Sequence, residues 1–455
     1  MSEAYKEEGI MAKIIVVGSN HAGTAAINTI LDNYKGNEVV VYDKNTNISF
    51  LGCGMALWIG QQIHSGDGLF YASPEGLAAK GAKIHMNAEV TAINPTKKTI
   101  TVTVDGVEKE DSYDKLILAT GSNPVVLPVP GHDLENIQLV KLYQNAKEVI
   151  EKLQAQPDIK DVVVMGAGYI GVELAEAFER LGKHVVMLDM ADRIMPRNFD
   201  VKFTDMMMEN MKAHNIEIRL GEGVQKFEGK DGKVCAVVTD KGTYKADMVI
   251  SAVGFKPNSA LGGDLFARFA NNAYLTNNKF ETSQKDIYAI GDCTTEFDNS
   301  TGKESYIALA TNAVRSGVVA AHNACGTAIE SLGVQGASGI CIYNLKMVTV
   351  GLTVAAAAKA GIEVSYTDFE DTQKPAFMEV ENPKVSIRIV YRKNDRVVVG
   401  AQLASTYDMS AQINMFSLAI QEKVTIDRIA LLDLFFMPHF NQPYNYVTMA
   451  ALTAK

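Results

Sequence analysis

The sequence predicts an α/β fold, with two Rossmann-like dinucleotide-binding domains and a C-terminal α+β interface domain. Two observations predict it. A strand, a glycine-rich turn, a helix and a second strand ending in an acid begin near residue 13, and the same order begins again near residue 161. From about Gly336, expected strands and helices alternate without a nucleotide motif. The 455 residues suffice for two to four such domains.

The first repeat starts with the apolar run 13–17, which is typical of a buried parallel strand. A helix is expected over 24–34, and a second strand over 38–43 ends in Asp43, an acceptor for ribose hydroxyls. The turn between them consists of Gly18, Ser19, Asn20, His21, Ala22 and Gly23. Asn20 replaces the middle glycine of G-x-G-x-x-G, so a turn without a ligand remains an alternative.

Cys53 stands between two glycines shortly after this unit, in the sequence Ser-Phe-Leu-Gly-Cys-Gly of residues 49–54. A helix is expected over 55–63, and the positive end of its dipole would stabilise a negatively charged sulfur. This pattern favours a reactive cysteine. A buried structural cysteine is the alternative.

The stretch between the repeats is expected to hold a small β meander over 83–104 and a strand over 114–122. That strand runs into a turn of small residues, namely Ala119, Thr120, Gly121 and Ser122. Prolines 124, 128 and 130 then interrupt regular structure and mark a domain junction.

The second repeat carries the complete motif Gly166-Ala167-Gly168-Tyr169-Ile170-Gly171 after the strand 162–165. The helix is expected over 172–181, and the strand 184–189 ends in Asp189. Asp189 at the ribose position favours a 2′-hydroxyl over a 2′-phosphate, whereas Arg193 nearby leaves that preference open. A strand expected over 248–258 reaches Gly254 and closes the unit.

Two parts of the chain, 12–125 and 261–330, are expected to form the first nucleotide-binding domain around the second one at 126–260. A strand over 286–292 ends in Gly-Asp, and a helix opens near residue 308. Residues 331–455 form the third domain. Its aromatic stretch 435–440 belongs either to the core or to an interface.

Composition excludes several classes of protein. A net charge of −10 without basic clusters argues against nucleic acid and against anionic membranes as partners. No apolar run reaches the length of a spanning helix, and the charged residues 1–10 do not form a signal peptide. Because Met11 directly precedes the first strand, these residues are either a disordered extension or the product of a start codon upstream of Met11. The five cysteines show no C-x-x-C pair and no metal-ligand spacing, which favours a reduced cytoplasmic location and predicts no metal site.

Together these motifs resemble the flavoprotein disulfide-reductase superfamily over nearly the whole chain. The resemblance rests on both glycine-rich turns, Ala119-Thr120-Gly121 and Gly291-Asp292, in the expected order. His21 and the stretch around Cys53 resemble the branch of NADH oxidases, NADH peroxidases and coenzyme A-disulfide reductases. The larger superfamily has C-x4-C, but here Trp58 occupies the second position, which leaves a single redox sulfur.

The resemblance implies two cofactors, FAD and NADH, and assigns their contacts. Asp292 would accept a hydrogen bond from the ribityl chain, and Tyr169 would cover the flavin face and swing aside for the nicotinamide. The family often has an aromatic residue for the NADH site at about this place, where this chain has Asn198. The implied FAD contacts are Gly18, Ser19, Asn20, His21, Ala22, Gly23, Asp43, Lys44, Cys53, Val90, Ala119, Thr120, Gly121, Ser122, Lys141, Asp292, Ala308, Leu309, Ala310 and Phe436, the last from a partner subunit of a homodimer. The implied NADH contacts are Gly166, Gly168, Tyr169, Ile170, Gly171, Asp189 and Gly254.

By the same resemblance, NADH reduces the flavin, O2 becomes peroxide, and the Cys53 thiolate takes up one peroxide oxygen as a sulfenic acid. His21 would supply the proton for the departing oxygen. The stretch 310–315 resembles water-forming oxidases, so an oxidase ranks before a peroxidase and before a coenzyme A-disulfide reductase. A flavin-bearing redox sensor with little turnover is the alternative that is not an enzyme.

Overall fold

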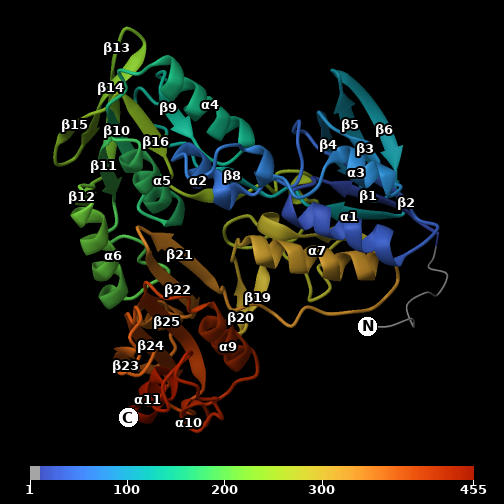
Figure 1. The fold of residues 1–455 in the computed structure, drawn as a ribbon. Helices are drawn as coiled ribbons and strands as arrows, with labels where there is room; N and C mark the ends of the chain where they lie inside the picture. The colour runs from blue at the N-terminus through green and yellow to red at the C-terminus, as the bar shows by residue number, and fades with distance from the viewer. Residues whose placement is uncertain (1–10) are drawn as a thin grey trace.

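The structure is a computed structural model that describes residues 11–455. Predictions about residues 1–10 lie outside the described part of the chain. Figure 1 shows three regions: one around β1 and α1, one around β10 and α5, and one around β21 to β25. The predicted fold class is confirmed, since parallel sheets form the first two regions and an antiparallel sheet with helices forms the third. The predicted domain boundaries stay a prediction.

The first region is a parallel sheet of five strands in the order β18-β7-β1-β2-β3. Its elements are β1 (Lys13–Val17), α1 (His21–Asn33), β2 (Glu38–Tyr42), β3 (Lys83–His85), β7 (Lys115–Leu118) and β18 (Ile287–Ala289), with α3 (Pro74–Ala79) beside β3. Helix α7 (Ala310–Ala324) packs on α1 so closely that a Cβ at Gly317 would lie 2.3 Å from the Ala22 carbonyl oxygen. Segments almost 300 residues apart in sequence therefore build one unit.

The second region repeats this plan with the strand order β12-β11-β10-β16-β9. Its elements are β9 (Ile137–Leu139), α4 (Tyr143–Ala155), β10 (Asp161–Met165), α5 (Tyr169–Arg180), β11 (His184–Asp189), α6 (Val201–Ala213), β12 (Glu217–Leu220) and β16 (Met248–Ser251). The helices of both repeats begin three residues before their predicted starts, at His21 and Tyr169. The chain thus enters each helix inside the glycine-rich motif.

Small antiparallel sheets flank these units. One holds β4 (Ala88–Asn94), β5 (Thr99–Val104) and β6 (Val107–Ser112), and another holds β13 (Val224–Lys230), β14 (Lys233–Thr239) and β15 (Thr243–Lys245). The predicted meander over 83–104 is partly wrong: β3 pairs in parallel with β2, because its backbone completes the large sheet. A ribbon of β8 (Ser122–Pro124) and β17 (Phe255–Pro257) joins the first two regions, where the prolines predicted a junction.

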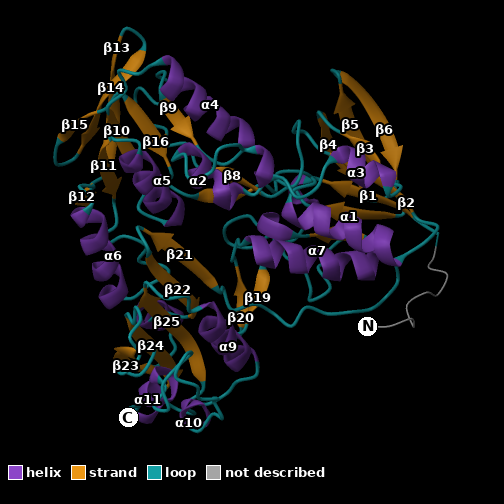
Figure 2. Ribbon diagram, viewed as in Figure 1, coloured by secondary structure: helices purple, strands orange, loops and turns teal. Residues whose placement is uncertain are grey.

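The third region is an antiparallel sheet in the order β21-β22-β25-β24-β23, with its helices shown in Figure 2. Its elements are β21 (Ser338–Ile342), β22 (Leu345–Gly351), α8 (Val354–Ala360), β23 (Val364–Thr372), β24 (Lys384–Arg392), β25 (Val398–Ser405), α9 (Ser410–Gln421), α10 (Ile426–Ala430) and α11 (Tyr446–Leu452). The hairpin of β19 (Glu296–Asp298) and β20 (Lys303–Ser305) follows β18. No helix in residues 11–455 combines the length and apolar character needed to cross a membrane.

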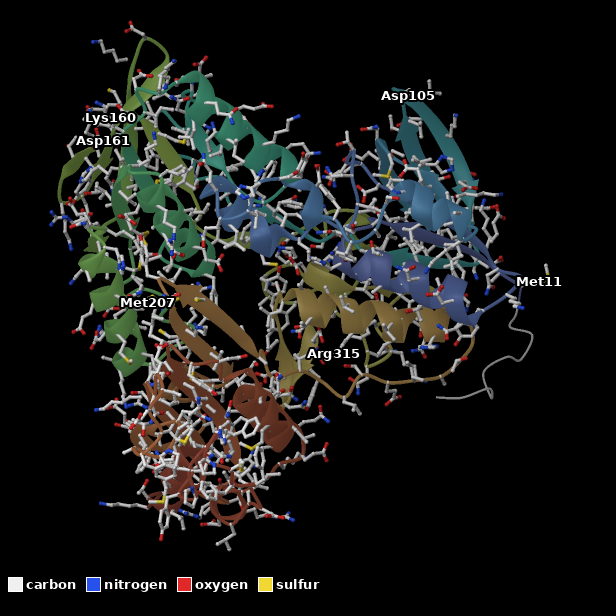
Figure 3. All side chains as sticks on the ribbon, in the orientation of Figure 1. Met11, Asp105, Lys160, Asp161, Met207 and Arg315 are labelled. Atoms are coloured by element: carbon white, nitrogen blue, oxygen red, sulfur yellow. The ribbon has the colours of Figure 1, made fainter. Side chains whose placement is uncertain are left out.

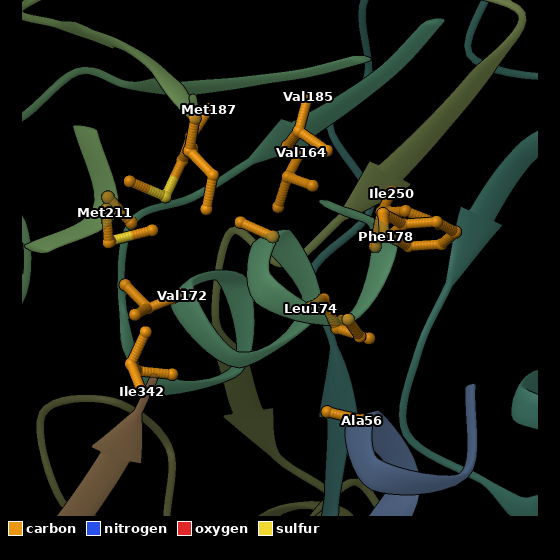
Figure 4. Packing of buried hydrophobic residues seen from close by; sticks show 14 of the residues in the cluster. Ala56, Val164, Val172, Leu174, Phe178, Val185, Met187, Met211, Ile250 and Ile342 are labelled. Atoms are coloured by element: carbon orange, nitrogen blue, oxygen red, sulfur yellow. The ribbon is translucent and has the colours of Figure 1, made fainter. Parts of the chain in front are cut away.

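Helix α5 packs against both other parts of the molecule. Figure 4 shows Ile342 of β21 near Val172 of α5 and Ala56 of α2 (Met55–Ile59) near Leu174, further along the helix. Both belong to the buried cluster that contains Leu174 and Phe178 of α5. Met207 of α6, labelled in Figure 3, is buried in the same cluster. The segment after Cys53 and the first strand of the C-terminal sheet are therefore both fixed to the second nucleotide unit.

Candidate active site

The first glycine-rich turn needs glycine for steric reasons at both of its ends. Gly18 has φ +94°, and a Cβ there would lie 2.3 Å from the Ala119 carbonyl oxygen. A Cβ at Gly23 would lie 1.9 Å from the Gly18 carbonyl oxygen. At the helix start, Asn20 makes no side-chain cap, so the first N–H groups of α1 keep no side-chain partner there. Such a helix start fits a pyrophosphate.

Asp43 organises this turn. Its Oδ2 accepts hydrogen bonds from the backbone N–H of Ser19 at 2.7 Å and from the Ser19 hydroxyl at 2.6 Å. Its Oδ1 accepts from the backbone N–H of Asn45 at 2.8 Å and from the Asn45 side chain at 3.1 Å. Asp43 is buried, while Lys44 beside it is exposed.

Three predicted FAD contacts form a polar cluster at the junction of the first two regions. The Ser122 hydroxyl donates to the Asp292 carboxylate at 2.8 Å, and Lys141 Nζ lies 3.6 Å from the same carboxylate. Lys141 also donates to the Ser122 hydroxyl and lies 4.4 Å above the Phe255 ring. Burial lowers the pKa of Lys141, and the Asp292 charge opposes this shift. The fold thus brings Lys141 into contact with two other predicted FAD contacts, Ser122 and Asp292.

His21 belongs to the same electrostatic neighbourhood. Burial lowers its pKa from 6.5, while Asp292 raises it and Lys141 lowers it further. Its Nδ1 lies 3.0 Å from the Tyr71 hydroxyl, and the two rings are parallel with centroids 5.7 Å apart. Burial raises the pKa of Tyr71 to about 12, so that phenol keeps its proton at neutral pH. Sequence reasoning missed Tyr71, because nothing in the 50 residues between them links it to His21.

The Cys53 thiol is exposed and lies in the short 3₁₀ turn Gly52–Gly54. The predicted helix over 55–63 is wrong in length, since α2 ends at Ile59. The backbone leaves the helix after the C-cap Gly60, since Gln61 has a positive φ of 56°. The short helix weakens the dipole argument for Cys53, whose position comes instead from packing on both sides.

That packing joins the two nucleotide units. A Cβ at Gly52 would lie 3.7 Å from the Lys141 carbonyl oxygen, and one at Gly54 would lie 2.3 Å from a Leu69 methyl carbon. Trp58, at the position of the missing second cysteine, stacks on Tyr143 of α4 with centroids 5.2 Å apart. Cys293 and Cys325 are buried, and all five cysteines are free. Cys53 therefore has no disulfide partner within the chain.

The second turn repeats the geometry of the first. Gly166 has φ +99°, and a Cβ there would lie 2.3 Å from the Ala252 carbonyl oxygen. A Cβ at Gly171 would lie 1.8 Å from the Gly166 carbonyl oxygen. Gly168 and Gly254 differ, because a Cβ at either would meet no atom within 4 Å. These two positions thus border open space, which fits a nucleotide backbone approaching the loop.

Asp189 binds its own loop as Asp43 does. It accepts from the backbone N–H of Ala167 at 2.6 Å and of Ala191 at 2.7 Å. Arg193, which left the nucleotide preference open, forms an ion pair with Asp205 at 2.6 Å. Its guanidinium thus already has an anionic partner.

Tyr169 and Glu173 lie on α5 beside this turn. The Tyr169 hydroxyl is 3.0 Å from the Ser338 hydroxyl, and burial raises the pKa of Tyr169 to about 12. Burial, aided by Glu176, raises the pKa of Glu173 to about 7. Sequence reasoning missed Glu173, although its spacing of four from Tyr169 places both on one helix face. Ile170 lies in the first turn of the same helix.

The remaining predicted contacts divide into two groups. Thr120 exchanges two hydrogen bonds with Asn258, and a Cβ at Gly121 would meet no atom within 4 Å. Val90 is buried on β4, while Ala308 and Leu309 precede α7, which begins at Ala310 without a side-chain cap. Phe436 is separate from these: it lies between α10 and α11 and is 47% exposed. A single chain does not bring Phe436 into the site.

Comparisons with known proteins identify this arrangement. The family described as pyridine nucleotide-disulphide oxidoreductase matches residues 12–317, and its dimerisation domain matches residues 337–446. An NADH oxidase of Streptococcus pneumoniae is 55% identical over 98% of this chain and 100% of its own length. An NADH oxidase of Lactococcus lactis is 49% identical over 97% and 100%.

A solved structure gives the same result. The water-forming NADH oxidase from Lactobacillus brevis, bound to NADH, is 38% identical, covers 97% of both chains and superposes with a TM-score of 0.94. The resemblance predicted from the two glycine-rich turns, from the Ala-Thr-Gly and Gly-Asp motifs and from the Cys53 stretch is thus confirmed. The chain belongs to the pyridine nucleotide-disulphide oxidoreductase family, among its NADH oxidases.

Proposed function

We propose that the protein oxidises NADH with O2 and forms water, with FAD as its bound cofactor and Cys53 as its single redox sulfur. The observation that carries this proposal is the exposed Cys53 thiol, in a segment that packs on Lys141 and Tyr143 of the second region, with Trp58 where a second cysteine would stand. The relatives named NADH oxidase support the same activity. The overall reaction consumes two NADH, one O2 and two protons, and yields two NAD⁺ and two waters.

The first unit fits FAD. The Gly18–Gly23 turn and the uncapped start of α1 would hold the pyrophosphate, and Asp43 would hold the ribose. Asp292 would accept from the ribityl chain, and the N–H groups of Leu309 and Ala310 would face the pyrimidine end of the ring. When bound, FAD supplies the electron transfer between NADH and O2.

The second unit fits NADH. Gly168 and Gly254 border open space where the pyrophosphate would approach, while Gly166 and Gly171 let the turn itself pack closely. The Asp189 carboxylate would bind the ribose 2′-hydroxyl and repel a 2′-phosphate. Because Arg193 is paired with Asp205, it offers little compensating charge to that phosphate. NADH should therefore be preferred over NADPH.

Cys53 and His21 would together reduce the peroxide that forms from O2. The Cys53 thiolate attacks one peroxide oxygen, the O–O bond breaks, and the departing hydroxide takes a proton from His21 to leave as water. The resulting sulfenic acid then takes up two electrons and one proton, which restores the thiolate and releases a second water. The Tyr71 hydroxyl, 3.0 Å from Nδ1 of His21, would fix the orientation of the imidazole during this transfer.

The experiment is a product balance with Cys53→Ser. Serine is nearly isosteric with cysteine but stays protonated at neutral pH, so it removes the nucleophile without opening a cavity. The parent should consume two NADH per O2 with little free peroxide, whereas the variant should consume about one and release peroxide. Cys341→Ser, which removes the other exposed thiol, is the matched control and should behave as the parent. Water formation by Cys53→Ser without peroxide would refute the role of the sulfur.

The same assay separates the alternatives. A peroxidase would consume NADH with added peroxide but not with O2 alone, and a coenzyme A-disulfide reductase would require that disulfide. A redox sensor would consume NADH only slowly under air. We also propose a homodimer, since Leu431, Phe435 and Phe440 are more than half exposed in the part that matches the dimerisation domain. A fully active monomer in sedimentation would contradict the dimer.

A further inference from the structure

An aromatic cluster of Phe50, Trp58, Phe70 and Tyr143 lies beside the Cys53 segment. Phe50 precedes Cys53 by three residues, and Trp58 follows it by five. Both of these rings meet the ring of Tyr143, the first residue of α4. Phe50 meets it edge-on, with centroids 5.8 Å apart, and Trp58 stacks on it at 5.2 Å. One ring of the second region therefore contacts the segment both before and after the cysteine.

Phe70 completes the cluster from a third segment. Its ring lies edge-on to Tyr143 at 5.1 Å and tilted against Phe50 at 5.7 Å. An antiparallel bridge joins the backbones of Phe50 and Phe70, and the Leu51 N–H donates to the Leu69 carbonyl oxygen at 2.8 Å. Aromatic pairs in such geometries attract each other beyond the burial of their area. The four rings thus form one connected packing unit.

The start of α4 is a fixed anchor for this cluster. The Asn145 side-chain oxygen accepts hydrogen bonds from the N–H groups of Lys141 at 3.3 Å and of Leu142 at 2.9 Å. These bonds fix the turn directly before Tyr143. The same turn also touches the segment next to the thiol, since a Cβ at Gly52 would lie 3.7 Å from the Lys141 carbonyl oxygen.

Local backbone structure alone holds the thiol weakly. Cys53 is exposed and lies in the short 3₁₀ turn Gly52–Gly54, whose hydrogen-bond geometry is poorer than that of an α-helix. Helix α2, which follows, is only five residues long. The place of the sulfur therefore depends on the rings that pack against its segment.

We propose that Tyr143 is a positioning residue for Cys53: through the aromatic cluster it keeps the sulfur where it captures peroxide before the peroxide leaves the site. The proposal rests on the proposed function, in which the Cys53 thiolate attacks peroxide. A shift of about 1 Å in a reacting group can slow its reaction about 100-fold. A displaced sulfur would then react more slowly than peroxide escapes, although NADH would still be oxidised.

The product balance of Tyr143→Leu tests the proposal. The peroxide released per O2 should rise at least about fivefold above the parent, and the NADH consumed per O2 should fall toward the value of Cys53→Ser. The kcat for NADH oxidation should change by less than about twofold, because the steps before peroxide do not use the sulfur. Tyr143→Phe keeps the ring and should behave as the parent.

Tyr343→Leu is the matched control. This tyrosine also stacks between two regions, on His214 after α6 with centroids 3.5 Å apart, but it belongs to the turn between β21 and β22. The variant loses a stacked ring of the same size and should release no more peroxide than the parent.

The fluorescence of Trp58, the one tryptophan of the chain, reports on the cluster without turnover. Acrylamide should quench it about twofold more efficiently in Tyr143→Leu, because one face of the indole loses its cover. Trp58→Leu removes the same stack from the other side and should release peroxide as Tyr143→Leu does. It tests the proposal independently if Tyr143→Leu does not fold.

A double-mutant cycle with Cys53→Ser connects the effect to the sulfur. Adding Tyr143→Leu to Cys53→Ser should leave the peroxide yield unchanged, since no sulfur remains to be displaced. Parent-like peroxide or parent-like quenching in Tyr143→Leu, or an equal rise of peroxide in Tyr343→Leu, would overturn the proposal. If Cys53→Ser itself releases no peroxide, the proposed function fails instead, so the two failures are distinguishable.

Discussion

In both nucleotide-binding units, a carboxylate at the end of the second strand accepts a hydrogen bond from the N–H that follows the first glycine. The Ser19 N–H lies 2.7 Å from the Asp43 carboxylate, and the Ala167 N–H lies 2.6 Å from that of Asp189. The first glycine of each turn also donates its N–H to the second strand at 2.8 Å. The two turns thus share one backbone device, although their sequences differ at the middle position.

The units differ in how far this device is covered. In the first unit α7 packs on α1, and Asp43 is only 5% exposed. In the second, Gly168 borders open space and Asp189 is half-buried. The difference teaches that one motif can serve a retained and an exchanging ligand, because access depends on neighbouring elements. This fits FAD as the retained cofactor of the first unit and NADH as the exchanging substrate of the second.

The largest effects should come from two single variants, each of which replaces the last glycine of one turn. A Cβ at Gly23 or at Gly171 would lie 1.9 or 1.8 Å from a carbonyl oxygen, so both sites must distort. Gly23→Ala should yield protein without flavin. Gly171→Ala should keep its bound flavin, but the rate at which NADH reduces that flavin should fall more than about tenfold.

Flavin absorbance per protein and anaerobic reduction by NADH measure the two losses. Dithionite is the control, since it should still reduce the flavin of Gly171→Ala. Equal loss of flavin in both variants would break the comparison, because the two turns would then support the same ligand or the same folding step.

A smaller effect is expected for Asp292→Ala. The ribityl chain loses its acceptor, and Ser122 and Lys141 lose a charged partner, so the Kd for FAD should rise about tenfold. Asp286→Ala is the control, because Asp286 precedes the same strand β18 and pairs with Lys98 and Lys115 instead. Titration of the apoprotein with FAD measures both constants. An equal loss of affinity in the control would show that the strand, rather than the Asp292 carboxylate, determines retention.

Asp189→Ala should narrow the preference for NADH over NADPH by about tenfold, since it removes the charge that faces a 2′-phosphate. The ratio of kcat/KM for the two nucleotides measures the effect. Adding Asp205→Asn should narrow the ratio further, because Arg193 then loses its anionic partner. Asp43→Ala should leave the ratio unchanged. Equal use of both nucleotides by the parent would contradict the role of Asp189.

The smallest effect concerns the stability linked to His21. Its pKa is lowered in the folded protein, so the unfolded chain binds the proton more readily. The free energy of unfolding is therefore highest above pH 6.5. It decreases as the pH falls below that value, because the unfolded chain takes up the proton first. His21→Gln removes the linkage. Relative to the variant, the parent should lose unfolding free energy between pH 7 and pH 5, measured by denaturant titration. A constant difference would show that His21 titrates normally.

The sequence by itself determined the two nucleotide units and their ligand class. Turn chemistry is local. Gly18 and Gly166 have positive φ next to a carbonyl oxygen, and each is followed within about 25 residues by the acid at the end of the second strand. The same local logic located Cys53 and the absence of a second thiol at Trp58. Such features are readable because the residues that enforce them are close in the chain.

Only the tertiary structure decided where elements end, which strands pair and which distant side chains meet between these units. Helix α2 ends at Ile59, before Gln61 at positive φ, and β3 pairs with β2 in the large sheet instead of with the meander. Tyr71 reaches His21, and Ser338 reaches Tyr169, over separations of 50 and 169 residues. Such contacts depend on how whole elements pack, and packing depends on the shape of many side chains at once, which no short stretch of sequence records.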